Sequence, residues 1–151
     1  MKITEALLAE HVVFHHLFDQ LEQTAKGVKS VVGLQTLATV LGGMLHQHSL
    51  VEDQLLMEPL DHCLDHLGQK ETFHDEHEMI DKSMALIMSA KTVPKARRQL
   101  LETIQRAREH FDKEERIVFP LAEDSLSDRT LKSLGQDWRE RRKIGIGKHR
   151  H

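Results

Sequence analysis

The sequence predicts an all-α protein, built as an antiparallel, up-down-up-down four-helix bundle with a short fifth helix at its C-terminal end. The 151-residue chain is rich in Leu, Ala, Glu, Gln, Lys and Met, and it contains only three prolines and no tyrosine. This composition favours helices. Apolar residues also recur at intervals of three and four along four long stretches, which is the helical period, and no stretch alternates for long enough to predict a strand.

The four long helices are expected over residues 4–25, 34–57, 71–90 and 94–119. Thr4 is a good N-cap for the first helix, and Gly27 lies just beyond its end. Pro94 suits the first turn of the fourth helix. Pro59 and Pro120 are expected to end the second and fourth helices, because proline lacks the backbone N–H and its ring clashes with the preceding turn.

The C-terminal part of the chain has a different composition. We expect residues 1–125 to form the bundle, and residues 126–151 to form a C-terminal helix and a basic tail that packs on the bundle or extends from it. This helix should begin at Ser127. From Arg139 to His151 the chain holds six Lys or Arg residues and one Glu, a composition typical of a solvated or partly disordered end.

Composition and charge restrict the functions that the chain can have. The net charge of −3 predicts no nucleic-acid partner and no membrane partner, and no apolar run approaches the ~20 residues that span a bilayer. A single cysteine, Cys63, excludes an internal disulfide and fits a reducing compartment. Because the amphipathic pattern begins almost at Met1, no signal peptide is expected and the predicted location is the cytoplasm.

Histidine interrupts the apolar face of each predicted long helix, and the second and fourth helices add a glutamate four residues later. The six residues are His11, His48, Glu52, His77, His110 and Glu114. Residues i and i+4 lie about 40° apart around a helix and ~6 Å apart along it, so each His–Glu pair points toward the same side. Because the pattern occurs twice, the two halves of the bundle should be related by an approximate two-fold axis.

Two glutamates on core faces require positive charge. Burying an ionised carboxylate without a partner costs on the order of several kcal/mol, and two facing carboxylates repel each other. No Lys or Arg shares these predicted core faces, so bound cations are the expected solution. Four imidazoles and two carboxylates are too many for one tetrahedral zinc and too rich in nitrogen for calcium or magnesium. They suit iron, with manganese or zinc as substitutes.

The repeated pattern of His, His-x-x-x-Glu resembles that of the hemerythrin-like, His-His-Glu cation-binding domain family, over about residues 4–121. An acidic residue follows each glutamate and a proline follows each of the two helices, as in that family. The ligands that the resemblance implies are His11 and His48 for one iron, His77 and His110 for the other, and Glu52 and Glu114 as bridges. It also implies a non-heme di-iron centre (Fe2+/Fe3+) with a bridging oxo or hydroxo group, which binds oxygen or a similar small ligand.

The chain departs from the oxygen-carrying members of this family at one position. Those proteins have a further histidine one turn before the ligand on the third helix, and that position is Phe73 here. The adjacent His74 lies about 100° away around the helix and is kept as a candidate additional metal ligand. Without it the site is more open and more symmetric, which argues against simple reversible oxygen carriage.

Other polar residues near the motif receive different interpretations. His15 and His16 compete with His11 for the role of ligand on the first helix, but only His11 is in line with the apolar face. Asp53 and Glu115 directly follow the two glutamates, and they are expected to hydrogen-bond to metal ligands rather than to bind the metal.

Two more local patterns leave alternatives open. His62 and His66 are expected in a polar turn after Pro59, because Cys63 stands where a zincin helix would need glutamate. Gly42 and Gly43 inside the second helix cost about 1 kcal/mol each relative to alanine. They indicate either a close approach of two helices or space for a diatomic ligand and its channel.

Three functions compete. The preferred one is a binding or sensing protein for oxygen or nitric oxide rather than an enzyme. The alternative is iron homeostasis, iron-centre repair, or a di-iron redox enzyme that reduces peroxide or nitric oxide. Repair ranks lower because some family members thought to repair iron centres carry a cysteine-containing segment before the domain, and only three residues precede Thr4. The third is a helical interaction protein without metal. A ferritin-like site would require Glu-x-x-His, which is absent from these stripes.

Overall fold

The computed structural model describes residues 1–147, and these residues form helices and short connections without any strand. The long helices are α1 (Ile3–Gly27), α2 (Val31–Glu52), α4 (Lys70–Met88), α5 (Val93–Lys113) and α7 (Asp128–Gly147). The shorter elements are η1 (Asp53–Met57), α3 (Glu58–His66), η2 (Glu114–Val118) and α6 (Phe119–Ser125). The predicted all-α class is confirmed.

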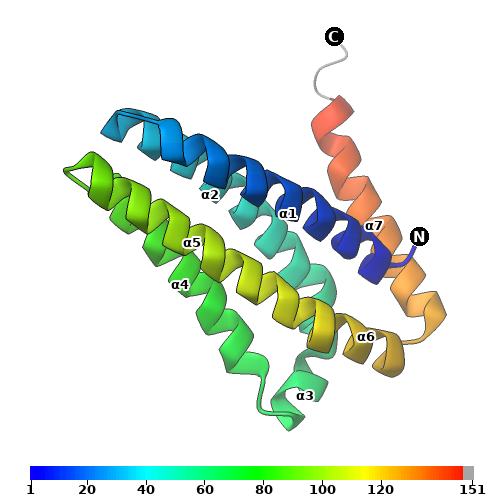
Figure 1. The fold of residues 1–151 in the computed structure, drawn as a ribbon. Helices are drawn as coiled ribbons and strands as arrows, with labels where there is room; N and C mark the ends of the chain where they lie inside the picture. Colours follow the sequence, from blue (N-terminus) through cyan, green and yellow to red (C-terminus); the bar gives the residue numbers. More distant parts are fainter. Residues whose placement is uncertain (148–151) are drawn as a thin grey trace.

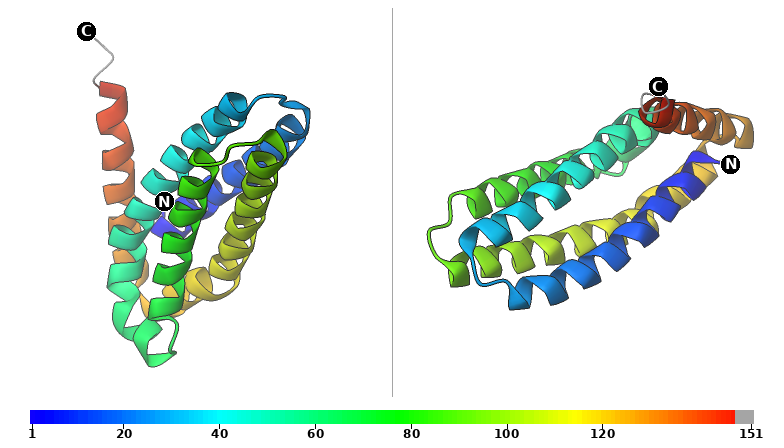
Figure 2. Two further views of the ribbon diagram at one scale, coloured as in Figure 1. Left: turned by 90° about the vertical axis from the view of Figure 1, so that its left-hand side faces the viewer. Right: turned by 90° about the horizontal axis from the view of Figure 1, so that it is seen from above.

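Four of the long helices, α1, α2, α4 and α5, lie side by side (Figure 1). Helix α5 packs against α4, α1 and α2, and α2 also packs against α4. Helix α7 lies against the N-terminal end of α1 and projects beyond the other helices, as the left view in Figure 2 shows. Among the described helices, none combines the length and the hydropathy that are needed to cross a membrane.

The helix starts follow local capping chemistry. Thr92 caps α5 by accepting a hydrogen bond from the backbone N–H of Lys95 at 3.4 Å, with Pro94 in the first turn as predicted. The prediction that Thr4 caps the first helix is wrong, because α1 begins at Ile3. The N-cap is Lys2, two residues earlier, and its backbone N–H donates a hydrogen bond to the Glu5 carboxylate at 3.2 Å.

The prediction that two prolines end helices is also wrong. Directly before each proline the chain makes a π-helical turn, in which the N–H of Glu58 donates to the carbonyl of Asp53 and the N–H of Phe119 donates to that of Glu114. Pro59 and Pro120 then occupy the first turn of α3 and α6, where a missing N–H costs little. The helical path therefore continues past both prolines.

The apolar core consists of two clusters. One contains Phe14, Phe18, Leu34, Leu41, Ile87, Leu100, Ile104 and Phe111, among others. The second contains Ile3, Leu7, Leu56, Leu60, Phe73, Val118, Phe119 and Leu131, among others. The His11 ring stacks on Phe111 at 3.9 Å between centroids and lies 5.1 Å from Phe119, so it contacts both clusters. The predicted polar residues therefore lie where the two apolar clusters meet.

The C-terminal helix is longer than predicted. It starts close to the expected place, and Ser127 accepts a hydrogen bond from the backbone N–H of Thr130 at 3.1 Å. However, it continues through the segment predicted to be a basic tail, as far as Gly147. Several of the basic side chains have partners on other helices: Arg141 bonds to Gln54 and Arg142 to Glu10. The last residues of the predicted tail, 148–151, lie outside the described part of the chain.

Candidate metal centre

The six residues that the sequence singled out are all buried, and none of these residues is more than 9% exposed: His11, His48, Glu52, His77, His110 and Glu114. They come from α1, α2, α4, α5 and the first residue of η2. The structure brings them into two adjacent groups of potential metal-binding atoms. Which of them bind a metal stays a prediction.

The first group joins α1 and α2. The Nε2 atoms of His11 and His48 are 3.1 Å apart. The Oε2 atom of Glu52 lies 3.1 Å from Nε2 of His48 and 3.4 Å from Nε2 of His11. These three ligand atoms are close enough to share one cation.

The second group joins α4 and α5 to the same glutamate. The Oε1 atom of Glu52 lies 3.5 Å from Nε2 of His77, and Oε1 of Glu114 lies 3.0 Å from Nε2 of His110. The same Glu114 atom is 3.8 Å from Nε2 of His11. The two carboxylates therefore lie between the two histidine pairs, in the pairing that the family resemblance implies.

Most buried polar atoms without a hydrogen-bond partner in the described chain belong to these residues. Those that face the centre are Nε2 of His77, Nε2 of His110, Oε1 of Glu52 and both carboxylate oxygens of Glu114. A buried polar atom left unpaired costs about 1–3 kcal/mol, so such a concentration is unfavourable without a further partner. A cation satisfies all of these atoms together, and an imidazole–carboxylate set fits a pair of transition-metal ions.

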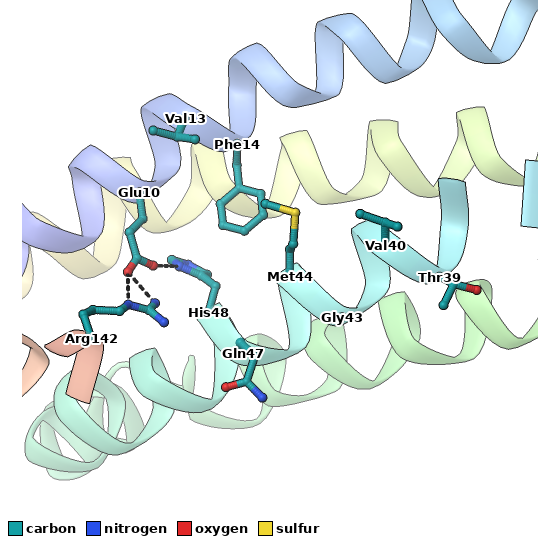
Figure 3. Close-up of a pocket in the computed structure, with 10 residues that line it drawn as sticks. All are labelled: Glu10, Val13, Phe14, Thr39, Val40, Gly43, Met44, Gln47, His48 and Arg142. Atoms are coloured by element: carbon teal, nitrogen blue, oxygen red, sulfur yellow. Dashed lines mark hydrogen bonds and ion pairs between the residues drawn. The ribbon is translucent and has the colours of Figure 1, made fainter. Parts of the chain in front are cut away.

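Each of the four histidines directs its other ring nitrogen, Nδ1, toward a carboxylate on the outer side. His48 Nδ1 donates to Glu10 Oε2 at 2.7 Å (Figure 3) and His110 Nδ1 donates to Glu76 Oε2 at 2.6 Å. A proton held on Nδ1 leaves the Nε2 lone pair directed inward, which is the arrangement that a metal-binding histidine requires.

The other two outer carboxylates make looser contacts. Asp53 lies 3.3 Å from Nδ1 of His77, and Glu115 lies 3.7 Å from Nδ1 of His11. Neither contact has hydrogen-bond geometry. Both acidic residues therefore lie beside histidines of the centre, but the hydrogen bonds that the sequence predicted for them are not formed.

Sequence reasoning missed the two stronger outer partners, Glu10 and Glu76. Each directly precedes a histidine of the centre but pairs with the histidine of the neighbouring helix. The signal was present, because the dipeptide Glu-His occurs at equivalent places in both halves of the repeat. Its meaning depends on which helix faces which, and periodicity alone does not supply that.

Burial and mutual charge determine the protonation of the metal-free centre. Burial, together with the charge of Glu52 nearby, raises the pKa of Glu114 well above its usual range. Burial opposes ionisation of Glu52, but the adjacent Glu114 carboxyl group and the neighbouring histidines lower its pKa. One carboxylate of the pair therefore keeps a proton while the other ionises.

The histidines also differ in protonation: two have raised pKa values and one has a lowered pKa. Burial disfavours their charged forms, but the facing carboxylates overcome this and raise the pKa of His48 to about 9 and that of His77 to about 10. Burial and the charge of His77 lower the pKa of His110 to about 4. At neutral pH, His48, His77 and Glu114 of the metal-free centre are therefore protonated. A metal ion that binds there would have to displace these protons.

His74, the candidate additional ligand, lies elsewhere. Its side chain is 69% exposed and faces Glu78, with 3.7 Å between Nε2 and Oε1. It belongs to neither group of the centre, because it lies about 100° around the helix from Phe73, the residue one turn before His77. Phe73 is buried and its ring lies 6.1 Å from that of His110.

The remaining histidine candidates lie at the surface. His16 is exposed, whereas His15 is half-buried and lies 3.2 Å from Glu115. His62 and His66 are exposed on α3, which is helical and not the expected turn. Cys63 is half-buried in the same helix.

Gly42 and Gly43 of α2 differ in their surroundings. A Cβ at Gly42 would contact Met84 of α4 at 3.6 Å, whereas a Cβ at Gly43 would meet nothing within 4 Å. Gly43 lines a cavity of about 620 Å3 with Phe14, Val40 and Met44, and the cavity reaches His48 (Figure 3). Gly42 therefore fits the interpretation of helix approach, and Gly43 fits that of space near the centre.

A comparison with protein families gives one match, and it covers just over half of the chain. Residues 68–145 match the model of the hemerythrin HHE cation-binding domain. Among curated proteins and solved structures, no match was found. The matched segment contains His77, His110 and Glu114, and the equivalent residues of the first half lie opposite them in the structure. The chain belongs to the hemerythrin HHE cation-binding domain family.

Proposed function

We propose that the protein is a cytoplasmic, non-heme di-iron protein that binds or senses oxygen or nitric oxide. In this proposal α1, α2, α4 and α5 form an antiparallel, up-down-up-down bundle that encloses the two irons. The observation that carries the proposal is the set of inward-facing, unpartnered nitrogen and oxygen atoms, divided into two groups that share Glu52.

In this proposal each residue of the centre has a definite role. His11 and His48 hold one iron, His77 and His110 hold the other, and Glu52 and Glu114 lie between them. The outer carboxylates keep the protons on Nδ1 and orient the imidazole rings. Nitrogen and oxygen ligands in this proportion suit iron better than calcium or magnesium.

The surroundings of the centre favour a small, weakly polar ligand. The rings of Phe111 and Phe119 pack against His11, and that of Phe73 lies near His110. These rings exclude water from the inner side of the centre. When bound, a pair of iron ions supplies coordination positions and electrons for a diatomic molecule. The cavity beside His48 has a largely apolar lining, which suits the passage of such a molecule.

The proposal is tested by loading the metal-free protein with Fe2+ under anaerobic conditions, followed by metal analysis and optical spectra before and after exposure to oxygen or nitric oxide. We expect two irons per chain and a new absorption band that depends on the gas. His74→Ala is the matched control, because this histidine lies outside the centre, and it should behave as the wild type does. Iron binding without any spectral response to either gas would contradict the ligand-binding role.

The same experiment tests the alternative, a di-iron redox enzyme. Sustained consumption of peroxide or nitric oxide in the presence of a reductant would favour that function over binding or sensing. A protein that retains no iron, and whose thermal stability is unaffected by chelators, would instead be a helical interaction protein.

A further inference from the structure

The two strong outer carboxylates, Glu10 and Glu76, are held by different parts of the molecule. Glu76 pairs with Lys113, which lies on the same helix as its histidine partner, His110. Glu10 instead is held by α7. Its Oε1 accepts hydrogen bonds from Nε1 of Trp138 at 2.6 Å and from Nη2 and Nε of Arg142 at 2.5 and 3.1 Å (Figure 3 draws the Arg142 contacts).

These contacts leave the other oxygen of Glu10 directed at the centre. While Oε1 accepts three hydrogen bonds from α7, Oε2 accepts the bond from Nδ1 of His48. Both oxygens of the Glu10 carboxylate therefore have hydrogen-bond partners: those of Oε1 lie on α7, and that of Oε2 is a histidine of the centre. Charge-assisted bonds from a guanidinium are among the stronger hydrogen bonds in proteins, so Arg142 restrains the rotation of this side chain.

Helix α7 is itself well placed to act as a support. Trp138 and Arg142 are four residues apart, which puts them on one face of the helix, and the guanidinium carbon lies 5.8 Å from the centroid of the indole ring. Leu131 is buried in the second apolar cluster, against which Trp138 packs. Gly135 allows α7 to cross the N-terminal segment closely, since a Cβ there would overlap the Met1 carbonyl.

We propose that Trp138 and Arg142 are positioning residues which, through Glu10, set the metal affinity of the His11–His48 position and leave the His77–His110 position unaffected. This inference rests on the proposed function, because it requires that the centre binds two metal ions. The physical cause is the hydrogen bond to His48, which orients the ring and raises the basicity of Nε2.

The inference is specific to one position because the contacts differ on the other side. His110 is oriented by Glu76, which Lys113 holds, and His77 faces Asp53. Among the hydrogen bonds and ion pairs of the described residues, none joins α7 to any of these five side chains. Through Glu10 and His48, the C-terminal helix is therefore connected by hydrogen bonds to one half of the centre.

The test is an anaerobic calorimetric titration of the metal-free, full-length protein with Fe2+. Trp138→Phe removes the indole N–H and keeps an aromatic ring, and Arg142→Ala removes the guanidinium. In each variant one of the two iron equivalents should bind about 10-fold or more weakly, in the range that loss of an outer hydrogen-bond partner causes, while the other is unchanged. Arg142→Lys should restore part of the lost affinity.

Lys143→Ala is the matched control, because Lys143 neighbours Arg142 but pairs only with Glu140 in the described chain. Both of its iron equivalents should bind as in the wild type. A double-mutant comparison then identifies the affected position. Arg142→Ala should add little to the effect of Glu10→Gln, because both act on His48, but it should combine additively with Glu76→Gln.

The outcomes separate the two proposals. If the wild type binds no iron, the proposed function itself fails. If the wild type binds two irons but the Trp138 and Arg142 variants keep both affinities, or lose both equally, α7 does not position His48 and the inference is overturned. Equal losses would indicate a general loosening of the bundle, which thermal unfolding of the metal-free variants would register independently.

Discussion

The first pair of long helices, α1 and α2, and the second pair, α4 and α5, present nearly the same atoms to the centre and different atoms to their outer side. On the inside, each pair contributes two histidine Nε2 atoms and a glutamate follows in the chain. On the outside, the first pair has an apolar cavity and the support of α7. The second pair has a smaller cavity lined by charged side chains such as Glu109 and Lys113.

This difference indicates which contacts of the centre must be the same in both halves and which can vary. Inward-facing carboxylates and imidazoles must satisfy one another and their cations, so both halves repeat the same solution. The outer contacts need only keep a proton on each Nδ1. A lysine of the same helix does this as well as an arginine and a tryptophan of a distant one, so the outer side is free to differ.

The largest effect is expected at Glu52, because it is the one residue shared by both groups of potential ligands. Glu52→Ala should abolish tight iron binding at both positions, a loss of more than about 100-fold, whereas His77→Ala should weaken only one. Metal analysis after gel filtration measures this. If Glu52→Ala retained one tightly bound iron, the two halves would not share this glutamate.

A second substitution separates metal binding from stability. In the metal-free protein Glu114→Met should raise the free energy of unfolding by about 1–3 kcal/mol, since it removes two buried carboxyl oxygens that have no hydrogen-bond partner. The same variant should bind iron poorly. Denaturant unfolding of both proteins in the presence of a chelator measures the change, and a destabilised variant would mean that the carboxyl group is satisfied.

The pH dependence of the metal-free protein should reflect the charged histidines of both halves. The folded-state pKa values of about 9 for His48 and about 10 for His77 lie above the value of about 6.5 for an unfolded histidine. Their stabilisation is therefore complete below pH 6.5 and is lost as the pH rises to 10. Loss of the Glu114 proton acts in the same direction.

We accordingly expect the melting temperature of the metal-free protein to fall by several degrees between pH 7 and pH 10. The iron-loaded protein should change less, because its histidines are already deprotonated. His77→Gln should flatten the curve of the metal-free protein and His74→Gln should not. A curve that is flat in the wild type would exclude protonated histidines in the centre.

The smallest effect concerns the cavity on the side of the first pair. Gly43→Ala should stabilise the protein by about 0.5–1 kcal/mol, because a methyl group there meets nothing within 4 Å and alanine favours the helix. Gly43→Leu should fill part of the cavity and slow the association of oxygen or nitric oxide with the iron-loaded protein. Met79→Leu, which lies at the smaller cavity, is the control for stopped-flow measurements.

The sequence was sufficient to predict the all-α class and the six buried residues of the centre. Both follow from strict periodicity and from the cost of burying Glu52 and Glu114 unpaired. The continuation of the helical path past Pro59 and Pro120 could not be predicted. A proline is compatible with a helix when the turn before it widens to a π-helical turn. The role of Trp138 was also hidden, since its partner Glu10 is distant in the sequence.

The two π-helical turns have one more consequence. Each adds one residue to an otherwise regular helix, so the segments beyond them are rotated by about 100° relative to an uninterrupted path. If residues 53–57 formed an ordinary α-helical turn instead, the His48–Glu52 spacing would be unchanged, but Leu60 and Leu64 would turn away from the second apolar cluster that contains them. The two π-helical turns therefore allow the buried His–Glu face of each helix and the apolar face of the segment that follows it to point in different directions.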